Sequence, residues 1–284
     1  MSWSHRKRAH SSDVTNVMNL TKVNKEPSVE TAEAVETAEA VETVETEAGP
    51  ARITWHPARH APRLVLALGH GAGGGIEARD LKALAAVLPA HGVTVALVEQ
   101  PWRVAGKKVA PAPKTLDLAW RGIWPALTKP GLPVISGGRS AGARVACRTA
   151  GELGAHAVLA LSFPLHPPGR PEKSRAGELL GAAVPTLVVQ GGNDPFGKPG
   201  EFPEYGRGRA LGVPSGVQLR GSTGARAVVG DGWAYELVEV AHGDHGFGVP
   251  KRADITQDEA LTVVTDVVVR WVDALGRHRP GPRG

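Results

Sequence analysis

Three residues of this chain carry the functional groups of a nucleophile, an acid and a base. Ser140 is the centre of the pentapeptide Gly138-Arg139-Ser140-Ala141-Gly142, Asp194 directly precedes a proline, and His245 lies in the segment 241–247, which reads AHGDHGF. A serine hydroxyl attacks a carbonyl carbon only when a neighbouring imidazole accepts its proton, and a carboxylate holds that imidazole in the required tautomer. The residue types are therefore those of covalent acyl transfer.

The pentapeptide by itself is weak evidence for a nucleophile. Glycine makes up 36 of the 284 residues, and at this composition a Gly-x-Ser-x-Gly match arises by chance roughly 0.2 times. Ser140 would also suit a helix N-cap, and Asp194 the start of an Asp-Pro turn. His242 competes with His245 for the base and Asp244, less favoured, competes with Asp194 for the acid, so their places in the fold must decide.

Apolar runs alternate with helical patterns along the chain. Helices are expected around 81–88, over 115–127, and from Thr256 onward, where Glu259 has the spacing of a capping box. The last of these helices has an apolar stripe, namely Leu261, Val264, Val268, Trp271 and Leu275. Such alternation predicts an α/β fold with a mostly parallel sheet and helices on both faces. Six short runs have the composition of buried parallel strands, namely 63–68, 93–98, 132–136, 157–163, 186–190 and 235–240.

The chemically capable residues follow the ends of these expected strands. In an open α/β sheet, ligands bind at the carboxyl edge of the strands, so side chains placed just after several strands converge there. Ser140, Asp194 and segment 241–247 each follow a different strand. The first strand leads into the glycine-rich loop 69–75, whose Ala72 N–H, together with that of Ala141, is a candidate oxyanion donor. His70 in the same loop is expected to support the loop by hydrogen bonding.

The order Ser, Asp, His along the chain is that of the α/β-hydrolases. The segments LALGHGAGGG, ISGGRSAGAR, LSFPLHPPGRPEKSR, LVVQGGNDPFG and VEVAHGDHGF resemble a dienelactone-hydrolase-like group of α/β-hydrolases. This group includes bacterial predicted hydrolases, a testis-expressed protein and the hydrolase-like part of a chromatin acetyltransferase-complex subunit. The resemblance implies an α/β-hydrolase fold and a catalytic triad of Ser140, Asp194 and His245. The chain departs from the dienelactone hydrolases proper, whose nucleophile is a cysteine.

The short connection 164–185 leaves no room for a large lid over the site. No metal or organic cofactor is implied by the motifs, because the glycine-rich loop lacks the phasing of a nucleotide-binding loop. The single cysteine, Cys147, is expected to be a small buried apolar residue rather than a second nucleophile. Two long segments, 99–114 and 213–232, are expected to be loops, the first of them close to the site.

Charge is distributed unevenly between the beginning and the rest of the chain. Residues 1–50 contain five Lys/Arg and nine Asp/Glu, whereas the remaining residues contain 28 and 19. The Glu repeat over 30–48 predicts a disordered acidic tail for 1–50 with no identified protein partner, followed by the hydrolase domain over 51–276 and a short disordered basic C-terminus over 277–284. The basic residues of the domain are scattered and not interleaved with aromatic residues, which disfavours nucleic-acid binding.

The sequence has no run of apolar residues long enough for a membrane span and no signal-peptide pattern, so the expected location is cytoplasmic, without membrane contact. The function predicted is that of a carboxylesterase-like serine hydrolase acting on a small-molecule ester or related acyl substrate through an acyl-enzyme. The alternative is a catalytically inactive interaction module that has kept the fold. An intact set of nucleophile, acid and base favours the enzyme.

Overall fold

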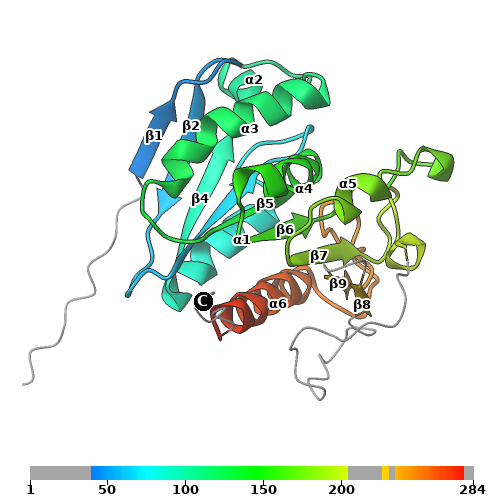
Figure 1. The fold of residues 1–284 in the computed structure, drawn as a ribbon. Coiled ribbons are helices and arrows are strands. Elements are labelled where there is room, and N and C mark those ends of the chain that lie inside the picture. Colours follow the sequence, from blue (N-terminus) through cyan, green and yellow to red (C-terminus); the bar gives the residue numbers. More distant parts are fainter. Residues whose placement is uncertain (1–39, 204–225, 230–233, 278–284) are drawn as a thin grey trace, which may run out of the picture. The chain divides into compact units, whose positions relative to one another are not determined.

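One mixed β-sheet forms the centre of the protein (Figure 1). The structure is a computed structural model, and it describes residues 40–203, 226–229 and 234–277. The strands in this part of the chain are β1 (Ala40–Val44), β2 (Ala51–His56), β3 (Leu64–Gly69), β4 (Val93–Glu99), β5 (Val134–Arg139), β6 (Ala157–Leu161), β7 (Thr186–Gly191), β8 (Arg226–Val229) and β9 (Ala234–Val240).

The strands are arranged in the order β1-β2-β4-β3-β5-β6-β7-β9-β8. The six strands from β4 to β9 in this order run parallel to one another. At the borders, β2 is antiparallel to β4 and to β1, and β8 is antiparallel to β9. Because parallel strands end at the same edge, the residues after β3, β5, β7 and β9 lie along one side of the sheet.

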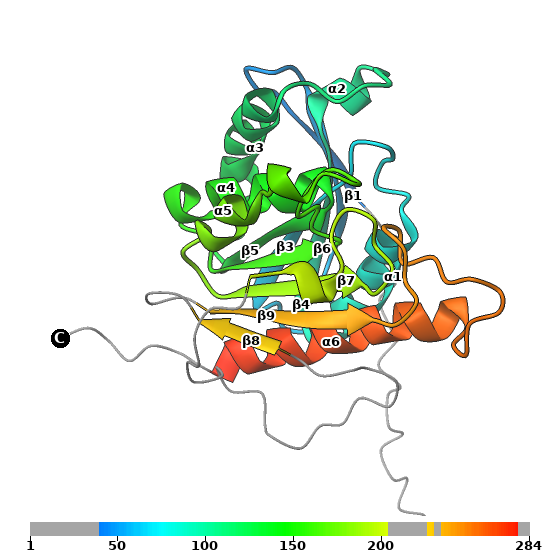
Figure 2. The same cartoon turned by 90° about the vertical axis from the view of Figure 1, so that its right-hand side faces the viewer.

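Helices cover both faces of the sheet, as the sequence predicts (Figures 1 and 2). One apolar cluster joins α1 and α6 to one face, and a second joins α2, α3, α4 and α5 to the other. All six residues of β3 are buried, which explains why this strand reads as a continuous apolar run rather than an alternating one. The helices are α1 (Arg79–Val87), η1 (Leu88–His91), α2 (Pro101–Val104), α3 (Pro113–Thr128), α4 (Ala141–Leu153), η2 (Pro171–Lys173), α5 (Ala176–Leu180), η3 (Pro199–Glu201) and α6 (Gln257–Arg277).

The predicted capping box begins α6. The backbone N–H of Glu259 donates to Thr256 Oγ1 at 3.2 Å, and the N–H of Thr256 donates to Glu259 Oε2 at 2.7 Å. Of the predicted stripe, Val264, Val268 and Trp271 are buried. The two ends of the stripe, Leu261 and Leu275, are only partly buried. The helix therefore begins and faces the sheet as its sequence predicts.

All six predicted strands are present, with ends that differ by a few residues. β1, β2 and β8 were not predicted. The connection between β6 and β7 contains only η2 and α5, so the described residues form no large lid. Of the two long segments, 99–114 contains α2, whereas 213–232 lies outside the described residues except for β8.

The predicted domain boundary at Ala51 is wrong, because β1 precedes it and pairs with β2 along its whole length. The Glu repeat has no apolar stripe at helical spacing, which is why the sequence predicts no ordered helix there. In a strand, however, only alternate side chains face the protein, and a strand at the edge of a sheet tolerates charged residues. Glu42 and Val44 are half-buried on this strand, and Glu42 Oε2 accepts a hydrogen bond from Trp55 Nε1 at 2.9 Å.

Residues 1–39 of the predicted tail lie outside the described residues. At the other end, Arg277 is the last residue of α6, and the remainder of the predicted C-terminal segment, 278–284, is likewise outside them. Among the helices that the structure describes, none combines the length and apolar character needed to span a bilayer.

Candidate active site

Ser140 lies at the sharp turn between β5 and α4, in a strained backbone conformation. Its φ is 54° and its ψ is −109°, a combination that residues other than glycine rarely adopt. The turn is tight because the backbones of the glycines on either side of Ser140 approach Gly69. A Cβ on Gly138 would lie 2.5 Å from the carbonyl oxygen of Gly69, and a Cβ on Gly142 would also contact that oxygen. The two glycines thus permit the turn that projects Ser140.

His245 and Asp194 continue from Ser140 in one line of hydrogen bonds. His245 Nε2 lies 2.8 Å from Ser140 Oγ, and His245 Nδ1 lies 2.8 Å from Asp194 Oδ2. Asp194 is fully buried, while one fifth of the His245 side chain remains exposed. The structure therefore brings together the three residues that the sequence predicts, with His245 between Ser140 and Asp194.

Asp194 accepts two further hydrogen bonds, which no sequence motif predicts. Gln190 Nε2 donates to Oδ2 at 2.8 Å, and the backbone N–H of Phe196 donates to Oδ1 at 2.8 Å. The ring of Phe196 also packs on the imidazole of His245, with centroids 4.2 Å apart. Phe196 lies two residues after the predicted acid, but no local signal in the sequence marks Gln190, which is the penultimate residue of β7.

The loops after β7 and β9 are joined through their backbones. The N–H of Gly192 donates to the carbonyl of Val240 at 2.9 Å, and that of Asn193 donates to Gly243 at 2.8 Å. These bonds hold the loop that carries Asp194 beside the loop that carries His245.

The two rival candidates in these loops have other contacts. His242 Nε2 pairs with Asp254 at 2.7 Å, and Asp244 Oδ1 accepts the N–H groups of Gly246 and Gly248, each at 2.7 Å. Asp244 thus shapes the loop that presents His245, and His242 points to a surface carboxylate.

His70 fastens the glycine-rich loop after β3. Its Nε2 accepts the N–H of Gln100 at 3.1 Å, so its Nδ1 carries the proton and donates to the Gly71 carbonyl at 2.8 Å. Burial lowers the pKa of His70, which keeps the ring neutral in this role. The N–H of Gly142 donates to the His70 carbonyl at 3.1 Å and connects the loop to α4. The expected supporting role of His70 is confirmed.

The predicted oxyanion donors lie on the segments that flank Ser140. Ala141 is the first residue of α4, and an N–H at this helical position has no acceptor within its own helix. Ala72 is exposed and follows Gly71, where a Cβ would lie 3.4 Å from the Cβ of Ser140. Both backbone segments therefore lie next to Ser140.

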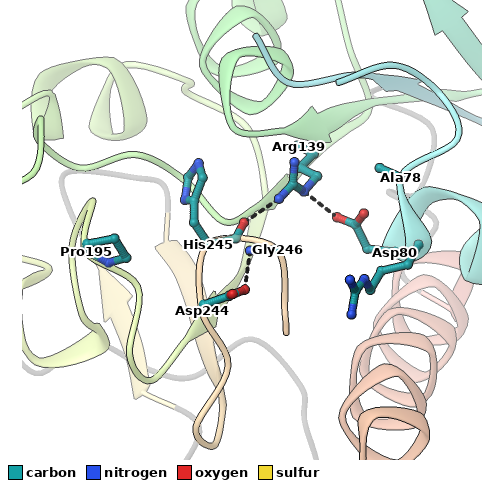
Figure 3. A pocket seen from close by; sticks show the side chains of 8 residues that line it. Ala78, Asp80, Arg139, Pro195, Asp244, His245 and Gly246 are labelled. Atoms are coloured by element: carbon teal, nitrogen blue, oxygen red, sulfur yellow. Dashed lines mark hydrogen bonds and ion pairs between the residues drawn. The ribbon is translucent and has the colours of Figure 1, made fainter. Parts of the chain in front are cut away.

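An open pocket of about 370 Å³ is lined in part by His245 and Arg139 (Figure 3). Its wall is charged, with contributions from α1, the end of β5 and the loops after β7 and β9. The lining residues are Ala78, Arg79, Asp80, Arg139, Pro195, Asp244, His245 and Gly246.

Cys147 is fully buried in α4, and burial raises the pKa of its thiol to about 12. It therefore stays protonated and packs as an apolar side chain, as predicted. Within the described residues, no group of three or more His, Cys, Asp or Glu side chains is arranged to hold a metal ion.

Comparison with known proteins gives the same fold. The model of the alpha/beta hydrolase domain family matches residues 61–218. A lidless serine hydrolase from Xanthomonas campestris has a TM-score of 0.57 and 18% identity over 83% of this chain and 95% of that one. A dienelactone hydrolase from Anabaena variabilis has a TM-score of 0.58 and 20% identity over 83% and 97%. None of the curated proteins matches the chain.

Proposed function

The chain belongs to the alpha/beta hydrolase domain family, and on that basis we propose that it is a serine hydrolase that cleaves an ester or a related acyl substrate. The observation that carries the proposal is the hydrogen-bonded line from buried Asp194 through His245 to Ser140. Backbone strain persists only where the surrounding structure maintains it. A non-catalytic interaction module would not require a strained serine hydrogen-bonded to this histidine and aspartate, so the strain at Ser140 favours an enzyme.

The reaction begins when Ser140 Oγ attacks the carbonyl carbon of the substrate. His245 Nε2 accepts the hydroxyl proton as the new C–O bond forms, and the carbonyl π electrons move to the oxygen. Asp194 stabilises the resulting imidazolium through its hydrogen bond with Nδ1. The oxyanion accepts hydrogen bonds from the N–H groups of Ala72 and Ala141, each of which contributes about 2.7–4 kcal/mol to the transition state.

The intermediate collapses as the bond to the leaving group breaks and His245 returns the proton to the departing oxygen. The acyl group is then an ester of Ser140. Water repeats the sequence, with His245 as the base, and releases the carboxylic acid and free Ser140. The exposed side of His245 gives water access for this second half of the reaction.

A fluorophosphonate probe tests the nucleophile directly, because it phosphonylates only an activated serine. We expect the wild type to be labelled and Ser140→Ala and His245→Gln to remain unlabelled. Two control variants should be labelled like the wild type: Ser174→Ala, an exposed serine on another loop, and His242→Gln, the histidine three residues before the base. Labelling that is absent from the wild type would favour the inactive interaction module, and labelling that survives Ser140→Ala would assign another nucleophile. A panel of esters that differ in acyl length would then define the substrate.

A further inference from the structure

Arg139, the residue before Ser140, contacts two segments of the site at once (Figure 3). Its Nη2 donates to the backbone carbonyl of His245 at 2.6 Å, and its Nε lies 3.3 Å from Asp80 Oδ2. A Cβ on Gly71, in the loop after β3, would lie 3.4 Å from Nη1. One planar guanidinium therefore links the loop that carries His245 to the first turn of α1, and it lies beside the glycine-rich loop after β3.

Asp80 is buried, with its side chain only 1% exposed, and Arg139 is its ion-pair partner. Burial raises the pKa of Asp80, and the charge of Arg139 opposes that rise. Both carboxylate oxygens have no hydrogen-bond partner at normal geometry among the described residues, so the ion pair with Arg139 is their main compensation. A buried carboxylate that depends mainly on this one side chain restricts where the guanidinium can lie.

The hydrogen bond to the His245 carbonyl is charge-assisted and therefore stronger and more directional than one between neutral groups. An arginine can make it and face Asp80 at the same time because its donors are held in a rigid planar fork, which a lysine lacks. Since Arg139 is the last residue of β5 and pairs with Leu161 of β6, its backbone is fixed by the sheet.

We propose that Arg139, anchored by Asp80, is a positioning residue that sets the place of His245 relative to Ser140. This inference rests on the proposed hydrolase function for its kinetic consequences, but the position of His245 can be observed without turnover. Arg139 acts through the His245 backbone and the imidazole makes the contact with Ser140.

The test compares Arg139→Met, the double variant Arg139→Met/Asp80→Asn, and the control Arg144→Met. Arg144 is a matched control because it is as buried as Arg139, at 19% against 17% exposure, and pairs with Glu178 away from His245. Three quantities are measured for each: the melting temperature, the rate of fluorophosphonate labelling, and the downfield proton resonance of His245 Nδ1–H, assigned by its loss in His245→Gln.

We expect Arg139→Met to slow labelling by about 10- to 100-fold, as small displacements of a catalytic group do, and to weaken or remove the His245 resonance. In ester assays kcat should fall while KM stays near the wild-type value. The double variant should have a higher melting temperature than Arg139→Met, since it leaves no unpaired buried charge, but its fluorophosphonate labelling should remain slow. Arg144→Met should keep both the rate and the resonance.

A merely structural role for Arg139 predicts that the double variant regains rate and stability together, and that result would overturn the inference. So would a wild-type resonance in Arg139→Met. If the wild type has the resonance but is never labelled, the proposed hydrolase function fails. Loss of the resonance in Arg139→Met would then still establish the positioning of His245.

Discussion

Gly142, in the first turn of α4, lies against the backbone of Gly69 at the end of β3, with no space for a side chain between them. The Cα of Gly142 is 3.4 Å from the place where a Cβ on Gly69 would be. Through this contact the strand that leads to the glycine-rich loop and the helix that follows Ser140 are held together. The close packing of α4 against β3 therefore requires the glycines of the pentapeptide.

Gly142→Ala should therefore destabilise the protein by about 1–3 kcal/mol, since the new methyl group forces the helix away from the Gly69 carbonyl. Gly151→Ala in the same helix is the control, because its Cβ would be no closer than 3.7 Å to its nearest neighbour. Replacing that helical glycine should raise stability, by up to about 1 kcal/mol. Urea denaturation of both variants checks the prediction, and equal effects at the two positions would contradict it.

Ser140→Gly should abolish labelling yet stabilise the protein by about 1 kcal/mol. Glycine adopts a φ of 54° without a steric penalty, and relief of strain of about 1–3 kcal/mol outweighs its greater backbone entropy in the unfolded state. Ser140→Ala also removes the hydroxyl but keeps the Cβ, so it should gain less stability than Ser140→Gly. Calorimetric melting of the two variants separates backbone strain from loss of the hydroxyl. A Ser140→Ala variant as stable as Ser140→Gly would argue against strain.

Asp194→Asn should lower kcat by about 10³- to 10⁴-fold with little change in KM, because a neutral amide neither fixes the His245 tautomer nor stabilises the imidazolium. Asp254→Asn, at the exposed partner of His242, should leave kcat at the wild-type value. Steady-state kinetics on one activated ester measures both. A comparable loss in the two variants would point to His242 as the base.

Glu236 in β9 predicts a pH dependence of stability. Burial raises the pKa of its carboxyl from 4.5 to about 7, so between these values the folded state binds more protons than the unfolded state. The contribution of Glu236 to the free energy of unfolding therefore falls as pH rises from about 4.5 to 7. Glu236→Gln should be more stable than the wild type at pH 8, by about 1–3 kcal/mol, and show no advantage at pH 4. Chemical denaturation at the two pH values tests this, and an advantage that does not depend on pH would refute the assignment.

The parallel strands of the fold could be predicted because both faces of the sheet are buried. Strands such as β3 and β7 are therefore continuous apolar runs, recognisable without knowledge of their neighbours. β1 and β2 lie at the border of the sheet, where one-sided burial weakens that signal. In β1, whose sequence is AVETV, Val41 is exposed while Glu42 is half-buried, so the segment resembles a solvated repeat unless the partner strand is known.

The residues of the candidate site were predicted because parallel strands end at one edge, so Ser140, Asp194 and His245 had to converge there. The amino-acid sequence by itself thus determined the residue types, their order and the edge at which they meet. Only the tertiary structure decided that His245 rather than His242 faces Ser140, and that Arg139 bridges Asp80 and the His245 carbonyl 106 residues away. The reason is physical: loop conformation and buried charge pairing depend on contacts between distant segments, and those contacts form no local pattern along the chain.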